Sequence, residues 1–189
     1  MQAQDLRQEV TRARHGDTDS AAHLFDRYYV RVYRYAYAKL GNSADAEDVA
    51  AETFAKMLRS LDGFRWKGAG FEAWLFRIAS NLIVDHHRRK GREQLHDDVL
   101  ETAPPAIDEF TPEVRLLRGE TFTELYQLMK ELSPEHREVL LLRFAAELDT
   151  HEVGEVMGRP VNNVRQLQFR ALRKLRKRML SEVAYDSPA

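Results

Sequence analysis

Three things are scarce in this chain: cysteine, long apolar runs, and the prolines and glycines that break helices. There is no cysteine, which excludes disulfides, thiolate zinc sites and cysteine redox sensing. No apolar segment approaches membrane-spanning length, and the N-terminus lacks the apolar centre of a signal peptide. We therefore expect a cytoplasmic protein without membrane insertion. The six prolines and nine glycines cluster between segments of helical rather than strand periodicity.

This periodicity predicts an all-α protein. We expect helices over residues 4–15, 19–40, 44–61, 70–90, 114–131, 134–146, 150–157 and 161–179. The segment from Glu93 to Glu113 holds seven carboxylates and three prolines but no lysine or arginine, a composition typical of a flexible linker. The prediction is two small helical domains, residues 1–92 and 114–182, joined by an acidic flexible linker over 93–113.

Negative charge is missing from one further segment. Between Glu155 and Glu182 there are eight lysines and arginines and no carboxylate, although the net charge of the whole chain is only -1. A segment of one sign is suited to a polyanion. Residues 149–160 have the pattern of a short capped helix, a glycine stop and a tight turn, and a longer basic helix follows. This order indicates a helix-turn-helix, whereas a basic helix that only complements its own dipole is the alternative.

The second of these helices has two distinct sides. Its apolar stripe consists of Val164, Leu167, Ala171, Leu172, Leu175 and Met179, and its polar side carries Asn162, Asn163, Gln166, Arg170, Arg173 and Lys177. Amides and arginines near the start of such a helix can pair with base edges in the major groove, and later cations can contact phosphates. Phe169 flanks this side, where it can touch a thymine methyl group. Gln168 falls in the apolar stripe, where an unpaired amide is costly.

The helix that begins near Ser43 also has an apolar stripe and an acidic side. The stripe consists of Ala46, Val49, Ala50, Phe54, Met57, Leu58 and Leu61. Asp48 and Glu52 lie one turn apart on the other side, beside small alanines that would let a partner helix approach. A docking surface is one interpretation of these acids, and compensation of the helix dipole is the other.

The loop over residues 61–70 combines two aromatic residues, two cations and three glycines. Such a loop suits single-stranded nucleic acid, because unstacked bases are held by aromatic stacking and cationic grooves. In the next helix we expect Phe71 and Trp74 in the core, and Asn81, Asp85 and Arg88 together on another side. The histidines of this helix are adjacent rather than one turn apart, so no metal site is expected. We find no phosphate-binding glycine loop and no nucleophile beside a base, so we expect neither a cofactor nor an enzyme.

Residues 45–54 and 71–89 resemble region 2 of the bacterial RNA polymerase sigma factors of the extracytoplasmic-function (ECF) group. Residues 132–144, continued through the helix-turn-helix to Leu175, are similar to region 4 of the same family. Both regions occur in the family's order, with an acidic linker between them. The resemblance covers residues 20–180.

The resemblance implies core RNA polymerase and promoter DNA as partners, and an anti-sigma factor as a further one. It implies that Asp48 and Glu52 dock on the clamp helices of the polymerase β′ subunit, and that the β subunit is contacted as well. The implied minus-10 residues are Arg65, Trp66, Lys67, Asn81, Asp85 and Arg88. The implied minus-35 residues are Arg165, Gln166, Phe169, Arg170 and Arg173, and the polar side of the same helix adds Asn162, Asn163 and Lys177 to the predicted surface.

The chain departs from the family pattern at several positions. Ala51 replaces a glutamine that is usual in the docking helix, and Gly154 replaces a small alanine in the helix-turn-helix. Asn163 and Leu167 stand where threonine and arginine are common. An alternative is a LuxR-type transcription regulator, which acts without core polymerase as an obligate partner. That class would carry a ligand or dimer face in residues 1–90 instead of an acidic docking helix and an aromatic loop.

Overall fold

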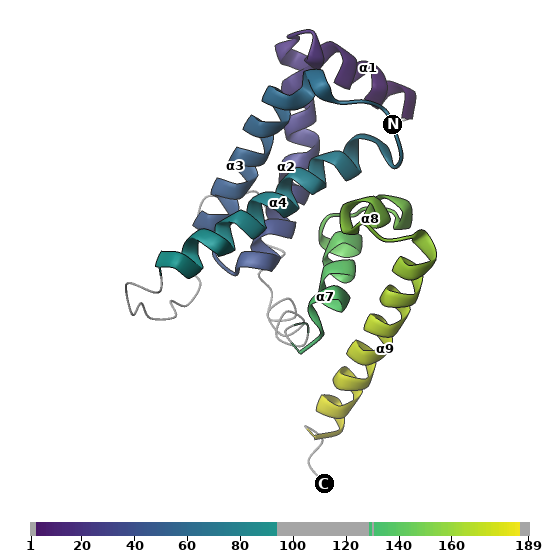
Figure 1. The fold of residues 1–189 in the computed structure, drawn as a ribbon. Coiled ribbons are helices and arrows are strands. Elements are labelled where there is room, and N and C mark those ends of the chain that lie inside the picture. The colour runs from purple at the N-terminus through teal and green to yellow at the C-terminus, as the bar shows by residue number, and fades with distance from the viewer. Residues whose placement is uncertain (1–2, 94–128, 130, 186–189) are drawn as a thin grey trace. The chain divides into compact units, whose positions relative to one another are not determined.

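The computed structural model describes residues 3–93, 129 and 131–185 (Figure 1). The chain divides into two compact units, Met1–Pro105 and Ala106–Ala189. The predicted linker, apart from Glu93, and most of the helix predicted over 114–131 lie outside the described residues. Every regular element in the described ranges is helical, which confirms the all-α prediction. None of these helices is long and apolar enough to cross a membrane.

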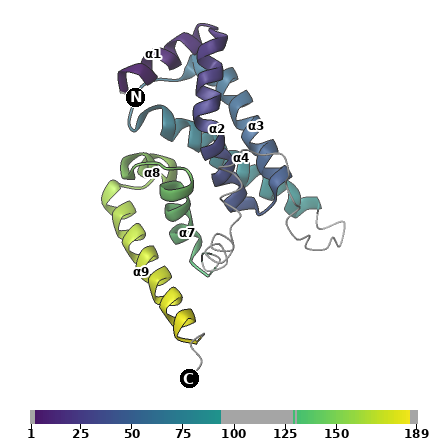
Figure 2. The same cartoon turned by 180° about the vertical axis from the view of Figure 1, so that it is seen from behind.

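The first unit is a bundle of four helices. They are α1 (Ala3–Arg14), α2 (Thr18–Leu40), α3 (Ser43–Ser60) and α4 (Gly70–Glu93), and a single 3-10 turn, Leu61–Gly63, follows α3. Helix α2 packs against the three others, and α1 lies at the end of the bundle near the loop that joins α3 to α4 (Figures 1 and 2).

Local capping fixes where these helices begin and end. The Asp17 side chain accepts a hydrogen bond from the backbone N–H of Asp19 at 3.2 Å and so caps α2. Asn42 caps α3 in the same way, with an acceptor distance of 3.0 Å from the Asp45 N–H. Gly41 ends α2 with a φ of 70°, a left-handed conformation that glycine adopts without steric cost.

Aromatic rings from α2 and α4 form the centre of this unit. Tyr28 lies 5.7 Å from Phe71, and Tyr35 lies 6.0 Å from Phe76, measured between ring centroids. An ion pair is enclosed beside them, with 3.0 Å between Arg31 Nη1 and a Glu72 oxygen. Each charge of the pair compensates the other, which offsets the cost of burying either one alone. Burial also raises the pKa of the Tyr28 phenol.

The second unit contains α7 (Pro134–Leu140), α8 (Thr150–Met157) and α9 (Val161–Tyr185). The helix predicted over 134–146 widens after α7 into a π-helical turn, Leu141–Ala145. Both α7 and α8 pack on α9. The capped helix and glycine stop predicted for residues 149–160 are confirmed. Asp149 accepts hydrogen bonds from the backbone N–H groups of His151 and Glu152, the Glu152 side chain accepts one from the Asp149 N–H, and Gly158 ends α8 with a φ of 63°.

The predicted apolar stripes are correct at their centres and wrong at their edges. In α9, Val164, Leu167, Ala171 and Leu175 are buried, but Leu172 is 39% exposed and Met179 is 49% exposed. In α3, Leu58 is 50% exposed. These residues belong to the apolar arc of the isolated helix, but the neighbouring helices cover a narrower arc. Gln168 is half-buried and leaves no buried polar atom without a partner, so the predicted desolvation cost does not arise.

Gly154 occupies a position in α8 that has no space for a side chain. A Cβ atom placed there would lie 2.8 Å from the carbonyl oxygen of Arg159 and 3.8 Å from Val164 Cγ2. The close neighbour is backbone, held by a 2.9 Å hydrogen bond from the Arg159 N–H to the Gly154 carbonyl. Glycine in place of the family's alanine therefore gives the backbone of the tight turn between α8 and α9 the space that it occupies.

We expect Gly154→Ala to destabilise the second unit. Overpacking costs about 1–3 kcal/mol, and the better helix propensity of alanine returns about 1 kcal/mol, so a net loss of up to about 2 kcal/mol is expected. Chemical unfolding followed by far-UV circular dichroism reports both units. Emission from Trp66 and Trp74 reports only the first unit, because the chain has no other tryptophan.

The circular dichroism transition should shift while the tryptophan transition stays in place. Gly63→Ala is the matched control, because a Cβ atom there would meet nothing within 4 Å. Equal stability of Gly154→Ala and the unchanged protein would show that the turn between α8 and α9 relaxes freely.

Candidate polymerase and promoter interfaces

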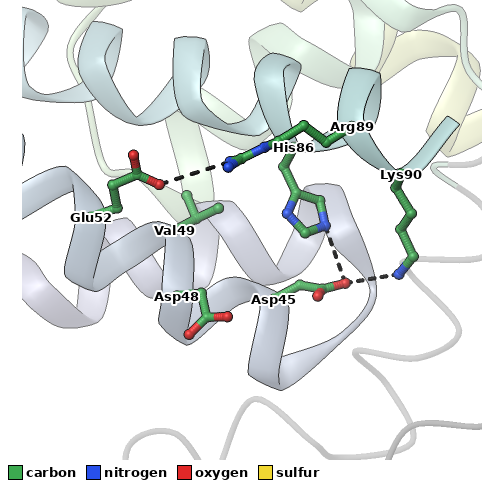
Figure 3. A pocket seen from close by; sticks show the side chains of 7 residues that line it. All are labelled: Asp45, Asp48, Val49, Glu52, His86, Arg89 and Lys90. Atoms are coloured by element: carbon green, nitrogen blue, oxygen red, sulfur yellow. Dashed lines mark hydrogen bonds and ion pairs between the residues drawn. The ribbon is translucent and has the colours of Figure 1, made fainter. Parts of the chain in front are cut away.

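A charged cleft lies between α3 and α4 (Figure 3). Its volume is about 520 Å³, and it is lined by Asp45, Asp48, Val49, Glu52, His86, Arg89 and Lys90. Acids come from α3 and bases from α4, so the two helices meet through side chains of opposite charge. The two predicted docking residues, Asp48 and Glu52, are both exposed on the α3 side.

The structure gives these two acids different surroundings. Glu52 lies 3.9 Å from Arg89, measured between Oε2 and Nη2. Asp48 forms no ion pair with any described residue, and its carboxylate points away from α4 (Figure 3). Asp48 is therefore open to a partner, whereas Glu52 is partly neutralised within the chain.

Asp45 is the centre of a cluster that the sequence analysis did not find. Its Oδ2 atom lies 3.0 Å from Lys90 Nζ and 3.4 Å from His86 Nε2. Burial lowers the pKa of the neighbouring His87, and the charges of Lys39, His86 and Lys90 lower it further. No group of side chains within the described ranges could hold a metal ion.

The loop between α3 and α4, residues 61–70, does not expose all the residues predicted for single-stranded DNA. Arg65 donates hydrogen bonds to the carbonyl groups of Asp62 at 2.8 Å and of Phe64 at 3.0 Å. Its guanidinium therefore braces the loop backbone. Trp66 is half-buried. Of the three residues predicted to contact DNA in this loop, Lys67 is the one that is exposed and makes no hydrogen bond to the described loop backbone.

Phe64 connects this loop to the core. It is only 6% exposed, and its ring lies 5.7 Å from Phe71 and 4.9 Å from Trp74. Phe71 is 1% exposed, in agreement with the prediction that it belongs to the core, whereas Trp74 is only half-buried.

The predicted minus-10 residues of α4 share one exposed side of the helix. Asn81, Asp85 and Arg88 are all exposed, and Arg88 Nη1 lies 3.6 Å from Asp85 Oδ1. Asn81 follows Gly70 by three helical turns, which is about 17 Å along the axis. The loop and this side of α4 can therefore contact different nucleotides of one strand.

The predicted minus-35 side of α9 is open to solvent. Asn163 is half-buried, and the seven others are exposed: Asn162, Arg165, Gln166, Phe169, Arg170, Arg173 and Lys177. The Phe169 side chain, apolar and 67% exposed, has no packing role here.

The eight cations of this segment divide into two groups. Arg159 pairs with Glu135, and Arg178 lies 2.7 Å from Glu131. The other six are exposed and make no ion pair with a described residue: Arg165, Arg170, Arg173, Lys174, Arg176 and Lys177. Two cations thus have partners inside the second unit, whereas six have none there.

A buried histidine lies behind the basic helix. His136 of α7 is 9% exposed, and its Nδ1 atom lies 2.8 Å from Ser133 Oγ. Burial lowers the pKa of His136, and the positive charges of Lys174 and Arg170 lower it further. The imidazole therefore favours its neutral form beside the cations of α9.

Both units match known protein families. Residues 24–93 match Sigma-70 region 2, and residues 128–177 match Sigma-70 region 4. The chain is similar to the ECF RNA polymerase sigma factor BldN of Streptomyces coelicolor, with 36% identity over 88% of this chain and 62% of that protein. It is 30% identical to the ECF RNA polymerase sigma factor SigW of Bacillus subtilis, over 92% of this chain and 96% of SigW.

Solved structures show the same fold. CnrH, solved in complex with the cytosolic domain of CnrY, has a TM-score of 0.67 at 24% identity, covering 96% of this chain and 98% of that one. The sigma factor RpoE from Bartonella quintana, solved with the anti-sigma factor NepR, has a TM-score of 0.63 at 21% identity, covering 82% and 94%. These comparisons favour the sigma-factor interpretation over the LuxR-type alternative. With both sigma regions matched in order, and SigW similar over nearly its whole length, the chain belongs to the ECF family of RNA polymerase sigma factors.

Proposed function

We propose that this chain binds core RNA polymerase and directs promoter recognition, DNA melting and transcription initiation. The observation that carries the proposal is that one chain combines a region 2 unit, which exposes the acids of α3 and one polar side of α4, with a region 4 unit, which exposes the basic helix α9. The chain acts by binding and carries out no chemical step itself. Its place of action is the cytoplasm, where its polymerase partner works.

Docking on the polymerase uses the acidic side of α3. Asp48 has no ion pair among the described residues and meets a cation of the β′ clamp helices directly. Glu52 does so after giving up its 3.9 Å contact with Arg89, a loose pair that costs little to break. The β subunit provides a second contact.

Promoter opening uses the α3–α4 loop and one side of α4. Trp66 and Lys67 supply an aromatic ring and a cation, which hold an unstacked base and its phosphate. Asn81, Asp85 and Arg88 contact the same strand further along, and Arg65 keeps the loop in shape.

Duplex recognition uses α9. Asn162, Asn163, Arg165, Gln166, Arg170 and Phe169 read base edges of the minus-35 element in the major groove, while Arg173 and Lys177 contact phosphates. An anti-sigma factor is proposed as a further partner, since RpoE was solved with one.

Gel filtration with core polymerase tests this function at the outset. A sigma factor co-migrates with core polymerase, and the assembled enzyme then initiates from specific fragments of a genomic library in run-off transcription. A chain that binds DNA but never co-migrates with core polymerase would be an independent regulator instead.

We expect reversal of both docking charges, Asp48→Lys with Glu52→Lys, to weaken core binding by more than the ~0.2–1 kcal/mol of one exposed ion pair. The helix should survive, because both residues lie outside the buried stripe. Fluorescence titration of labelled protein with core polymerase measures the affinity, and circular dichroism measures the helicity.

Asp26→Lys is the control, since it reverses an exposed carboxylate on α2. Arg89→Gln adds a test of opposite sign, because releasing Glu52 should slightly strengthen core binding. Unchanged affinity in the double variant, with helicity intact, would remove these acids from the docking surface.

In the minus-35 region, Arg170→Ala and Lys177→Ala should have different effects. If Arg170 pairs with a guanine, its loss should cost about 1–3 kcal/mol and relax the base preference at one position. Lys177→Ala should weaken binding evenly across sequences and reduce the salt slope by about one unit. Titrations of holoenzyme against single-base promoter variants at several salt concentrations separate these effects, and equal loss on every variant would argue against base reading by Arg170.

Asn81→Ala should leave minus-35 binding unchanged and impair opening of the minus-10 region. A residue that holds an unstacked base acts only after the duplex has opened. Permanganate footprints of holoenzyme on linear promoter DNA detect unpaired thymines, with Asp26→Ala, at an exposed residue of α2, as the control. Full opening by Asn81→Ala would exclude this residue from the site.

A further inference from the structure

Helix α1 contacts the α3–α4 loop at two points. The Arg7 guanidinium carbon lies 5.1 Å from the centroid of the Trp66 ring, and Arg14 Nε lies 3.9 Å from Asp62 Oδ1. Both views of the fold show α1 close to this loop (Figures 1 and 2). The residues of each pair are far apart in the sequence. The match to Sigma-70 region 2 begins at residue 24, so it does not include α1.

The Trp66 ring has a neighbour on three sides. Arg7 covers one face, within the ~6 Å range in which a guanidinium attracts an indole. Phe64 meets the ring at an interplanar angle of 74° and a centroid distance of 5.1 Å. On another side, a Cβ atom at Gly70 would lie 3.7 Å from Trp66 Cζ3. Trp66 is nevertheless only half-buried, so part of the side chain is available to a ligand.

This support matters because the loop backbone is otherwise permissive. Gly68 and Gly70 both have positive φ values, 56° and 84°. Ordering a flexible loop on binding costs conformational entropy, and fixing it in advance reduces that cost. Arg65 braces the loop backbone through the Asp62 and Phe64 carbonyls, but it has no contact of this kind with the indole.

We propose that Arg7 is a positioning residue for promoter opening, because it holds the Trp66 ring in the orientation that receives an unstacked base. Helix α1 thereby becomes part of the minus-10 surface. Arg14 contributes little, since Asp62 is 89% exposed at the other end of a 3.9 Å pair. The proposal rests on the proposed function, in which this loop contacts the opened strand.

The central variant is Arg7→Gln, which removes the cation and keeps a polar side chain. Arg12→Gln is the matched control, because it removes the same charge from an exposed position of the same helix. In a Trp74→Phe background, which keeps an aromatic ring beside Phe64, acrylamide quenching of the emission reports the freedom of Trp66. In holoenzyme, closed-complex affinity and the rate of opening are measured at a promoter selected by run-off transcription with the unchanged protein.

We expect Arg7→Gln to increase quenching of Trp66 and to slow opening about two- to fivefold, with closed-complex affinity and melting temperature matching those of Arg12→Gln. Arg7→Lys should recover part of the opening rate, because an ammonium group also binds a ring face.

Equal opening rates for Arg7→Gln and Arg12→Gln, or unchanged quenching, would overturn the proposal. The proposal would also fail if both variants lost the same closed-complex affinity and Arg7→Gln showed no additional loss in opening rate. That result would indicate only a general attraction between the cations of α1 and DNA phosphates. If the unchanged holoenzyme initiates from no promoter, the proposed function fails. The quenching comparison then still decides whether Arg7 holds Trp66.

Discussion

The first unit depends on the burial of Phe71, where three parts of the chain meet. Its ring lies 5.7 Å from Tyr28 of α2, 5.7 Å from Phe64 of the loop and 5.7 Å from Trp74 one turn further along α4. One buried side chain therefore fixes the start of α4, the bundle core and the root of the promoter loop. Because apolar burial is non-directional but interiors are close-packed, a change at Phe71 would affect the loop and the exposed side of α4 as well as stability.

Charge is arranged in opposite ways at the proposed interfaces. At the α3–α4 cleft, acids and bases of the same unit neutralise one another, and Asp48 is the acid that forms no pair among the described residues. On α9, six cations form no ion pair with any described residue. A protein clamp helix can be recognised through a few well-placed charges, whereas DNA presents a dense line of phosphates and is attracted by many. The net charge of -1 conceals this difference.

The proposed promoter loop is held by contacts of several kinds. Arg65 acts as a structural brace, Phe64 as an anchor in the core, and Trp66 as a ring supported from α1. Phe64 and Arg65 therefore shape the loop before any DNA is bound. Preorganisation of this kind lowers the entropic cost of capturing a base, and it explains how a loop with three glycines can still present a defined surface.

The all-helical fold, the capped α8 with its glycine stop, the buried centres of the helix stripes and the open basic side of α9 could all be predicted from the amino-acid sequence. These features follow from local chemistry: helical period, capping side chains and charge within one segment. Tertiary structure alone decided the Asp45 cluster with His86 and Lys90, the pairing of Glu52 with Arg89, the Arg7 contact with Trp66, and the exposure of Leu58, Leu172 and Met179. Each of these depends on which residues from distant parts of the chain become neighbours, or on how wide an arc of a helix its neighbours cover, and neither quantity is present in the spacing of residues along a single helix.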